Sequence, residues 1–160
     1  MPQTLEEILS EKLLAAVGNQ DGDEVKNLIR IAYKAGIEPM SMVNRRGPDG
    51  ETALHIAARH SGDEPLITHI LLREGANVIE KNLHGQAAIH IAAFAGNLKI
   101  STMLTECGAN IRAEDLSGKT PLDIAKERNF AEEAALLVSY GGERQPAVPL
   151  APTQTQKYSR

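Results

Sequence analysis

The chain has 160 residues, of which 42% are apolar and 24% are charged, and its formal net charge is −4. This composition is that of a folded globular protein, and it excludes wholesale disorder. An acidic chain also lacks the basic excess of a general nucleic-acid binder, and no run approaches the ~18 apolar residues of a membrane-spanning helix. Aromatic residues are scarce, so a core built from aliphatic side chains and alanine is expected, which favours thin, closely stacked helices.

The N-terminal segment predicts a helix pair. Thr4 and Glu7 form a capping box that opens a helix running to about Val17. Its expected apolar stripe consists of Leu5, Ile8, Leu9, Leu13, Ala16 and Val17. A second helix is expected from about 23 to 35, with Val25, Leu28, Ile29, Ile31 and Ala32 available for packing. Residues 36–43 are expected to form a loop.

Three later segments repeat one another. Residues 50–59, 85–94 and 118–127 align, and their leading glycines are 35 and 33 residues apart. The aligned positions hold Thr-Ala-Leu-His at 52–55, Ala-Ala-Ile-His at 87–90 and Thr-Pro-Leu-Asp at 120–123. An apolar helical stretch and a second glycine follow each segment, so each unit predicts a pair of helices.

Local signals place the ends of these helices. Thr52 and Thr120 suit the N-cap position, and Pro121 suits the first helical turn, where its missing donor is not needed. Gly75 and Gly108 follow the second helices, where a left-handed residue is expected to end a helix. We therefore expect the four pairs to begin near Leu5, Thr52, Ala87 and Thr120.

This pattern resembles the ankyrin-repeat family, whose unit of about 33 residues carries Thr-Pro-Leu-His at the start of its first helix. The resemblance implies an all-α solenoid of stacked helix-turn-helix pairs joined by β-turn loops. We expect one domain over residues 1–142, with approximate repeats at 1–44, 45–79, 80–112 and 113–142, and a disordered, proline-containing tail at 143–160. The last repeat is expected to be a solvent-facing cap, with polar residues Lys126, Glu127, Arg128, Glu132 and Glu133.

Histidine and cysteine side chains raise the question of a chemical site. His55 and His90 occupy the signature position, where the imidazole is expected to bond to the backbone and tie adjacent repeats together. They lie one repeat apart, roughly 10 Å, which is too far to share a metal ion. Cys107 is the single cysteine, so no internal disulfide is possible and a reducing, cytosolic location is expected. We expect no catalytic, cofactor-binding or metal-binding residue.

In the family that the chain resembles, partners are held by the β-turn fingertips and the exposed side of the first helices. The corresponding residues are Arg45, Arg46, Asp49, Glu51, Arg59, Lys81, Leu83, His84, Gln86, Phe94, Glu114, Leu116, Lys119 and Glu127. Leu83, Phe94 and Leu116 are apolar at positions that the fold does not need to bury, which predicts a hot-spot core between a basic rim and an acidic rim. The alternative is that Phe94 packs between helices and Leu83 shields a turn.

These observations predict a protein–protein interaction module that is monomeric alone and that binds and inhibits or masks another protein through its concave face and fingertips. We expect it to bind neither nucleic acid, nor a membrane, nor a cofactor. Two alternatives remain: a secreted host-directed effector or adaptor that uses the same surface, and an enzyme or metal protein on an ankyrin scaffold. Structural self-assembly would need uncapped apolar ends, whereas the sequence indicates a cap at both ends.

Overall fold

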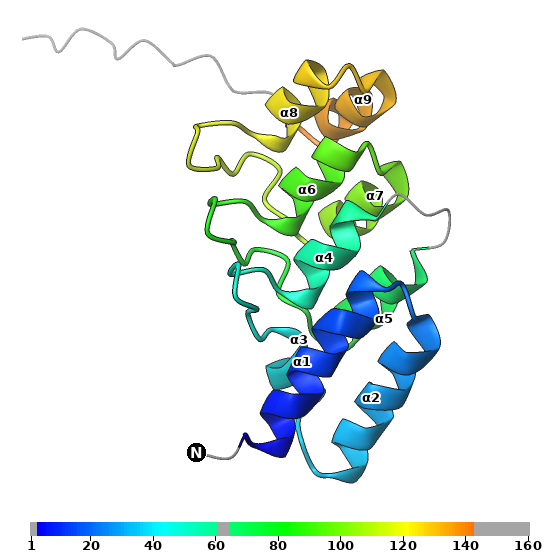
Figure 1. Ribbon diagram of the computed structural model, residues 1–160. Coiled ribbons are helices and arrows are strands. Elements are labelled where there is room, and N and C mark those ends of the chain that lie inside the picture. The colour runs from blue at the N-terminus through cyan, green and yellow to red at the C-terminus, as the bar shows by residue number, and fades with distance from the viewer. Residues whose placement is uncertain (1–2, 61–64, 143–160) are drawn as a thin grey trace, which may run out of the picture.

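The computed structural model describes residues 3–60 and 65–142 (Figure 1). The predicted tail at 143–160 therefore lies outside the described residues. The helices of the described part are α1 (Leu5–Gly18), α2 (Gly22–Lys34), α3 (Pro39–Val43), α4 (Ala53–Arg59), α5 (Leu66–Arg73), α6 (Ala88–Ala95), α7 (Leu98–Glu106), α8 (Pro121–Glu127) and α9 (Ala131–Ser139).

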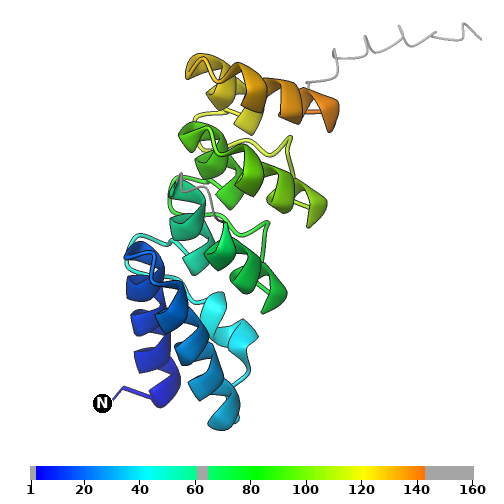
Figure 2. The same cartoon turned by 90° about the vertical axis from the view of Figure 1, so that its right-hand side faces the viewer.

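The helices form two layers of a stack, with one antiparallel pair above another (Figure 1 and Figure 2). The first layer contains α1, α4, α6 and α8, in which each helix packs on the next. The second layer contains α2, α5, α7 and α9, and the long loops between repeats project to one side. The described residues contain no β-strand, which confirms the all-α solenoid of helix pairs.

The predicted starts of the first helices of all four pairs are confirmed. The backbone N–H of Glu7 donates to the Thr4 hydroxyl, and the Thr4 N–H donates to the Glu7 carboxylate, which completes the predicted capping box. The helices α4 and α8 begin directly after the predicted N-cap residues Thr52 and Thr120, and α6 begins directly after Ala87, near which a helix start was expected. Gly75 and Gly108 have φ angles of 87° and 89°, as expected of left-handed residues that end helices.

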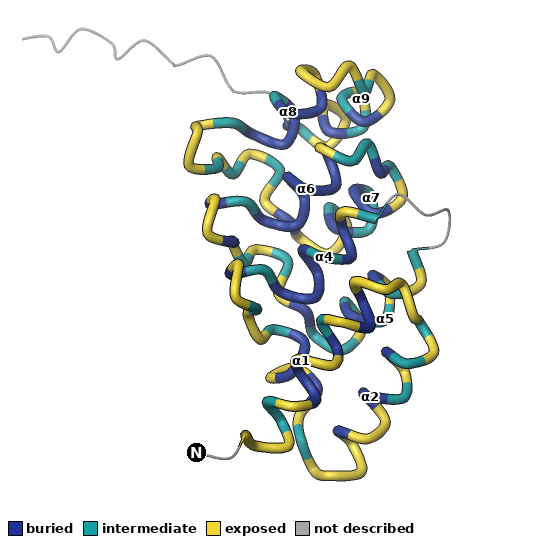
Figure 3. The backbone as a smooth tube through the Cα atoms, viewed as in Figure 1, coloured by how far each residue is buried: buried dark blue, intermediate teal, exposed yellow. Residues whose placement is uncertain are grey.

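The core is aliphatic and runs through all four pairs (Figure 3). Alanine pairs at 57–58 and 92–93 are buried, and their small size lets neighbouring first-layer helices approach closely. Three residues of the predicted stripes are instead exposed: Leu5 (51%), Ile8 (36%) and Ile31 (37%). They lie on the sides of α1 and α2 that face away from the packed helices, so the buried stripe is narrower than the apolar pattern indicated.

Residues 36–43 were expected to form a loop, but the structure has the short helix α3 within this segment. Pro39 occupies its first turn, where the fixed φ angle of proline favours a helix, and Met42 and Val43 are buried. Asn44 follows directly: its side chain donates to the carbonyl of Gly75 (2.9 Å) and accepts from the N–H of residue 77 (2.7 Å). The longer segment therefore ties the N-terminal pair to the next repeat.

The expectation of a fully solvent-facing last repeat was wrong for Glu133. This side chain is 1% exposed, whereas Lys126, Glu127, Arg128 and Glu132 are exposed. The Ser101 hydroxyl on α7 donates to Glu133 Oε1, and Oε2 has no hydrogen-bond partner. Burial raises the pKa of this carboxyl, although the bond from Ser101 partly opposes the shift. Glu133 lies on the side of α9 that packs on α7, so tertiary packing overrides its polarity.

Gly85 and Gly118 provide a matched test of how one repeat supports the next. Both are left-handed, with φ of 71° and 74°, so alanine is strained at either position. A Cβ at Gly85 would lie 2.9 Å from the backbone nitrogen and 3.0 Å from Cγ of Leu116, whereas a Cβ at Gly118 meets nothing within 4 Å.

We expect Gly118→Ala to lower the free energy of unfolding by about 1 kcal/mol through backbone strain. Gly85→Ala should lower it by about a further 1–2 kcal/mol, because Leu116 must move. Denaturant unfolding followed by circular dichroism measures both losses. Equal losses would show that the contact between Leu116 and the preceding loop contributes no stability.

Candidate protein-binding surface

Three fingertip loops, residues 47–51, 82–86 and 115–119, have the same backbone geometry. In each, the first N–H donates to the last carbonyl and the glycine N–H donates back to the first carbonyl, at 2.9–3.0 Å. In the second and third loops, Asn82 and Asp115 also accept two backbone N–H groups on one side-chain oxygen. The fingertips are thus rigid turns, which confirms the predicted β-turn loops and fixes the direction of the side chains they carry.

His55 and His90 hold these fingertips on the helices. Each imidazole accepts at Nδ1 from the N–H of its own N-cap residue, Thr52 or Ala87, at 3.2 Å. Because Nδ1 accepts, the ring proton lies on Nε2, which donates to a carbonyl of the following repeat: Gln86 for His55 (3.0 Å), and Ala113 for His90 (2.9 Å). The expected structural role of both histidines is confirmed.

Burial lowers the pKa of His55 and of His90, because desolvation disfavours the imidazolium, although the carbonyls that they contact partly oppose this. Protonation at Nδ1 would also remove the acceptor that each N-cap N–H uses. Neutral imidazole is therefore the form that ties the repeats together.

The last repeat has Asp123 at the histidine position. Its Oδ2 accepts from the Thr120 N–H (3.0 Å) and hydroxyl (2.9 Å), which preserves the half of the histidine arrangement made within the repeat. An aspartate is shorter than a histidine and, when ionised, has no proton to donate to a further carbonyl. The series of imidazole links between repeats therefore ends at α8.

The fourteen residues predicted for the surface all lie on the fingertips, beside them or on the first-layer helices. Eleven are exposed, and Glu51, Gln86 and Lys119 are partly buried. Glu51, Gln86 and Lys119 occupy equivalent positions before the first helices of their repeats, and Arg59, Phe94 and Glu127 occupy equivalent positions at or near the ends of those helices. We call the two positions together a rung, so each of the last three repeats carries one: Glu51 with Arg59, Gln86 with Phe94, and Lys119 with Glu127.

The three apolar residues of the predicted hot spot are exposed: Leu83 by 65%, Phe94 by 52% and Leu116 by 79%. Leu83 covers Gly50 of the preceding fingertip, and Leu116 covers Gly85 in the same way. The alternative that Leu83 shields a turn is therefore correct in part, but most of its side chain still faces solvent. Phe94 does not pack between helices, since half of its side chain is exposed.

The charged residues differ from the predicted arrangement of one basic and one acidic rim, because most of them pair across the surface. The ion pairs are Arg45 with Glu7 (3.1 Å), Arg46 with Glu80, Arg59 with Glu51 (2.5 Å) and Lys119 with Glu127 (2.6 Å). Lys81 donates to the Glu114 carbonyl at 2.8 Å. The first and third rungs are thus ion pairs in which the acidic and basic residues exchange positions. The middle rung, Gln86 with Phe94, is uncharged.

Sequence reasoning missed Arg128, which it assigned to the polar cap. The Arg128 guanidinium lies over the Phe94 ring, 4.2 Å from its centroid, and 5.6 Å from the centroid of Phe130. The aromatic residues in consecutive repeats were a weak signal, since cations in proteins often stack on such rings. The contact itself depends on how α6 and α8 are stacked.

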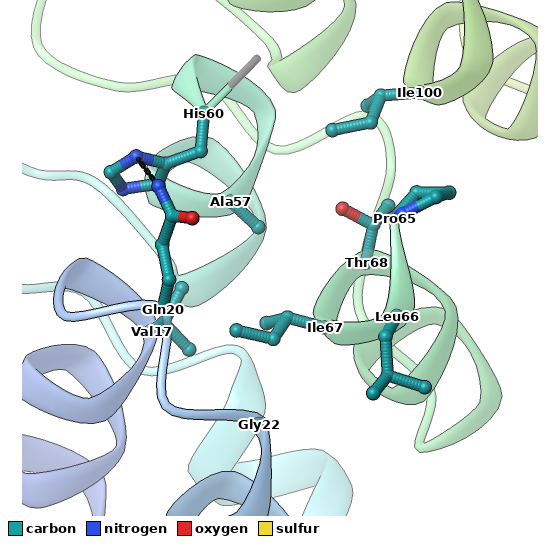
Figure 4. A pocket seen from close by; sticks show the side chains of 10 residues that line it. All are labelled: Val17, Gln20, Gly22, Ala57, His60, Pro65, Leu66, Ile67, Thr68 and Ile100. Atoms are coloured by element: carbon teal, nitrogen blue, oxygen red, sulfur yellow. Dashed lines mark hydrogen bonds between the residues drawn. The ribbon is translucent and has the colours of Figure 1, made fainter. Parts of the chain in front are cut away.

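Away from this surface, a cavity of about 340 Å³ lies between the α1–α2 turn, α4 and α5 (Figure 4). Its lining is mostly aliphatic, with a hydrogen bond of 2.8 Å between Gln20 and His60 at one side. Within residues 3–60 and 65–142, no group of three or more histidine, cysteine, aspartate or glutamate side chains could hold a metal ion. No helix in the same residues is long and apolar enough to cross a membrane.

Comparison with known families agrees with the repeat geometry. The family described as ankyrin repeats in three copies matches residues 13–115 and 54–147. The chain belongs to the ankyrin-repeat family. Ankyrin repeats are units of protein–protein interaction, so the chain is a module that binds another protein.

Several curated relatives contain a similar segment. The mouse B-cell lymphoma 3 protein homolog is 32% identical over 120 residues, which is 72% of this chain and 25% of the relative. The mouse protein phosphatase 1 regulatory subunit 27 is 40% identical over 63 residues, or 39% of this chain and 41% of the relative. The zebrafish palmitoyltransferase ZDHHC17 is 39% identical over 62 residues, or 38% of this chain and 10% of the relative. The chain thus spans less than half of each of these proteins.

Proposed function

We propose that this ankyrin-repeat chain is a non-catalytic regulatory protein that masks or inhibits its partner by covering one of the partner's functional surfaces. The contact would be made by the concave face and the fingertips. The observation that supports this most directly is the exposure of Leu83, Phe94 and Leu116, by 65%, 52% and 79%, on two rigid fingertips and the helix α6. Exposed apolar side chains on a preorganised scaffold have the character of interface hot spots, because little entropy is lost when they bind.

Two further observations agree with a regulatory role. One relative is named as a regulatory subunit of protein phosphatase 1. The ion pairs on the first and third rungs leave an uncharged middle rung, so a partner would meet an apolar centre inside a polar margin. The free, exposed thiol of Cys107 is consistent with action in a reducing compartment such as the cytosol.

Substitution of the apolar centre tests the proposal. Phe94→Ala combined with Leu83→Ser and Leu116→Ser should preserve the helical circular dichroism spectrum, because these side chains contribute little to the core. Affinity for the partner recovered from a lysate of the source organism should fall by more than ~2 kcal/mol, the usual scale for hot spots. Calorimetric titration with the purified partner measures the loss.

The matched control replaces three exposed aliphatic residues of the second layer, Ile31, Leu66 and Val138, with serine. This variant should bind the partner as the unchanged chain does. If the partner binds the first variant with unchanged affinity, or if only the control variant loses affinity, the contact lies elsewhere. An unchanged activity of the partner in the complex would contradict masking while leaving the binding surface intact.

A further inference from the structure

The strongest unassigned feature is the cluster of Phe94, Arg128 and Phe130, where the ends of α6 and α8 meet. The Arg128 guanidinium carbon lies 4.2 Å from the Phe94 ring centroid and 5.6 Å from that of Phe130. The Phe130 ring is itself held against the α6–α7 turn, because a Cβ on Gly96 would lie 3.1 Å from three of its carbons. The cation is therefore held by rings from two repeats, one of them fixed against the backbone.

Arg128 differs from the basic residues of the predicted surface. Those five residues, Arg45, Arg46, Arg59, Lys81 and Lys119, all donate to a carboxylate or a carbonyl of the chain. The Arg128 guanidinium instead stacks on the two phenylalanine rings, and within the part of the chain that the structure describes it forms no ion pair with a carboxylate. Its neighbour Glu127 already pairs with Lys119 at 2.6 Å.

A stacked guanidinium is well suited to binding an external acceptor. Stacking uses the flat face of the group and leaves its N–H donors, which lie in the plane, directed outward. A carboxylate can accept two of these donors at once, and such paired, charge-assisted bonds are stronger than neutral ones. The exposed half of the Phe94 ring beside them offers contact to an apolar side chain.

We propose that Phe94 and Arg128 form the specificity-determining site of the interaction surface, and that its ligand is an aspartate or glutamate side chain next to an apolar residue in the partner. The carboxylate binds the guanidinium edge, and the apolar neighbour packs on the Phe94 ring and the uncharged middle rung. This inference rests on the proposed function and adds the chemistry of the partner segment.

The test uses phage-displayed random peptides, joined to the coat protein through their C-terminal ends, panned on the full chain. Because such peptides have no free terminal carboxylate, only side-chain carboxylates can be selected. We expect the enriched peptides to share an aspartate or glutamate beside a leucine, isoleucine, valine or phenylalanine. A synthetic copy of one enriched peptide, and its counterpart with the acid replaced by the matching amide, are then titrated by fluorescence anisotropy.

Arg128→Ala should weaken binding of the acidic peptide by about tenfold or more, and the amide peptide should lose a similar factor on the unchanged chain. The two losses should not add, because they remove the same contact. Arg30→Ala is the matched control, since Arg30 is an exposed arginine on the second-layer helix α2, outside the interaction surface, and donates to Asn27 at 2.9 Å. It should change the affinity less than about twofold.

Several results would overturn this inference. They are enriched peptides without a shared acid, equal effects of Arg128→Ala and Arg30→Ala, and failure of the library to yield any binding peptide. If the partner depends on Leu83, Phe94 and Leu116 but not on Arg128, the proposed function stands and this inference fails. If neither dependence is found, both fail.

Discussion

Replacing His90 with alanine should lower the free energy of unfolding by about 2–3 kcal/mol, because it leaves polar groups in two repeats without partners. The Ala87 N–H loses its acceptor at Nδ1, and the Ala113 carbonyl loses the proton on Nε2. His90 is fully buried, so little water is available to replace either bond. Denaturant unfolding at neutral pH measures the loss.

Two variants separate the local and long-range parts of this effect. His90→Asn keeps an acceptor near the Ala87 N–H, as Asp123 does for Thr120, but is too short to bond to the next repeat, so it should lose less stability than alanine. His84→Ala removes an exposed imidazole on the neighbouring fingertip and should change stability by less than about 0.5 kcal/mol. A loss at His84 equal to that at His90 would contradict the assigned role.

The same geometry sets a pH dependence. The pKa of His55 and of His90 lies below the ordinary value of 6.5 in the folded chain, so the unfolded chain binds more protons below that pH. The stabilising effect of the two neutral rings is complete above about pH 6.5 and is lost as the pH falls through the lowered pKa values. The loss on acidification should be smaller in the His90→Asn variant, which has one of these groups fewer.

Glu133→Gln should raise the free energy of unfolding at pH 7 by about 1–2 kcal/mol, since it removes a buried ionisable carboxyl that has one unpartnered oxygen. Glutamine has the same shape and retains an oxygen that can accept from Ser101. Because burial raises the pKa of Glu133 above 4.5, the cost of burying this carboxyl begins as the pH rises above 4.5, where the unfolded chain ionises first, and is complete above the raised pKa. The advantage of glutamine should therefore shrink as the pH falls toward 4.5.

Glu132→Gln is the matched control for this variant. It removes the same charge from the adjacent position of α9, where the side chain is exposed, and should change stability by less than about 0.5 kcal/mol at any pH. Stability curves measured from pH 4 to pH 8 by thermal or denaturant unfolding compare the two. A destabilised Glu133→Gln variant would mean that the carboxylate has a favourable partner and that its burial is not a cost.

The helix pairs could be predicted in detail because their signals act over short stretches of chain. Thr4 and Glu7 cap α1 across three residues, and the N-cap residues before α4, α6 and α8 act over the same distance. The helix α3 escaped prediction because five residues are too few to show a helical period, and its stability depends on burying Met42 and Val43 against other elements.

The candidate surface could be predicted only in outline. The repeat alignment placed Leu83 and Leu116 at equivalent fingertip positions and Phe94 near the end of a first helix, and their exposure agrees with that alignment. The neutralisation of the expected basic rim could not be seen in advance, because Arg45 and Arg46 pair with residues 38 and 34 positions away. Ion pairing across such separations follows from how the repeats stack.

The sequence by itself determined the repeat phase, the helix starts and the histidine positions, since glycines, caps and signature residues act through neighbouring backbone groups. Tertiary structure alone decided that Glu133 is buried while Glu132 is exposed, and that Arg128 stacks on Phe94 instead of pairing with an acid. These outcomes depend on the rotation and spacing of successive helix pairs. Small differences in that stacking decide which side of a helix packs on its neighbour. The residues next to each position in the sequence carry no signal for these differences.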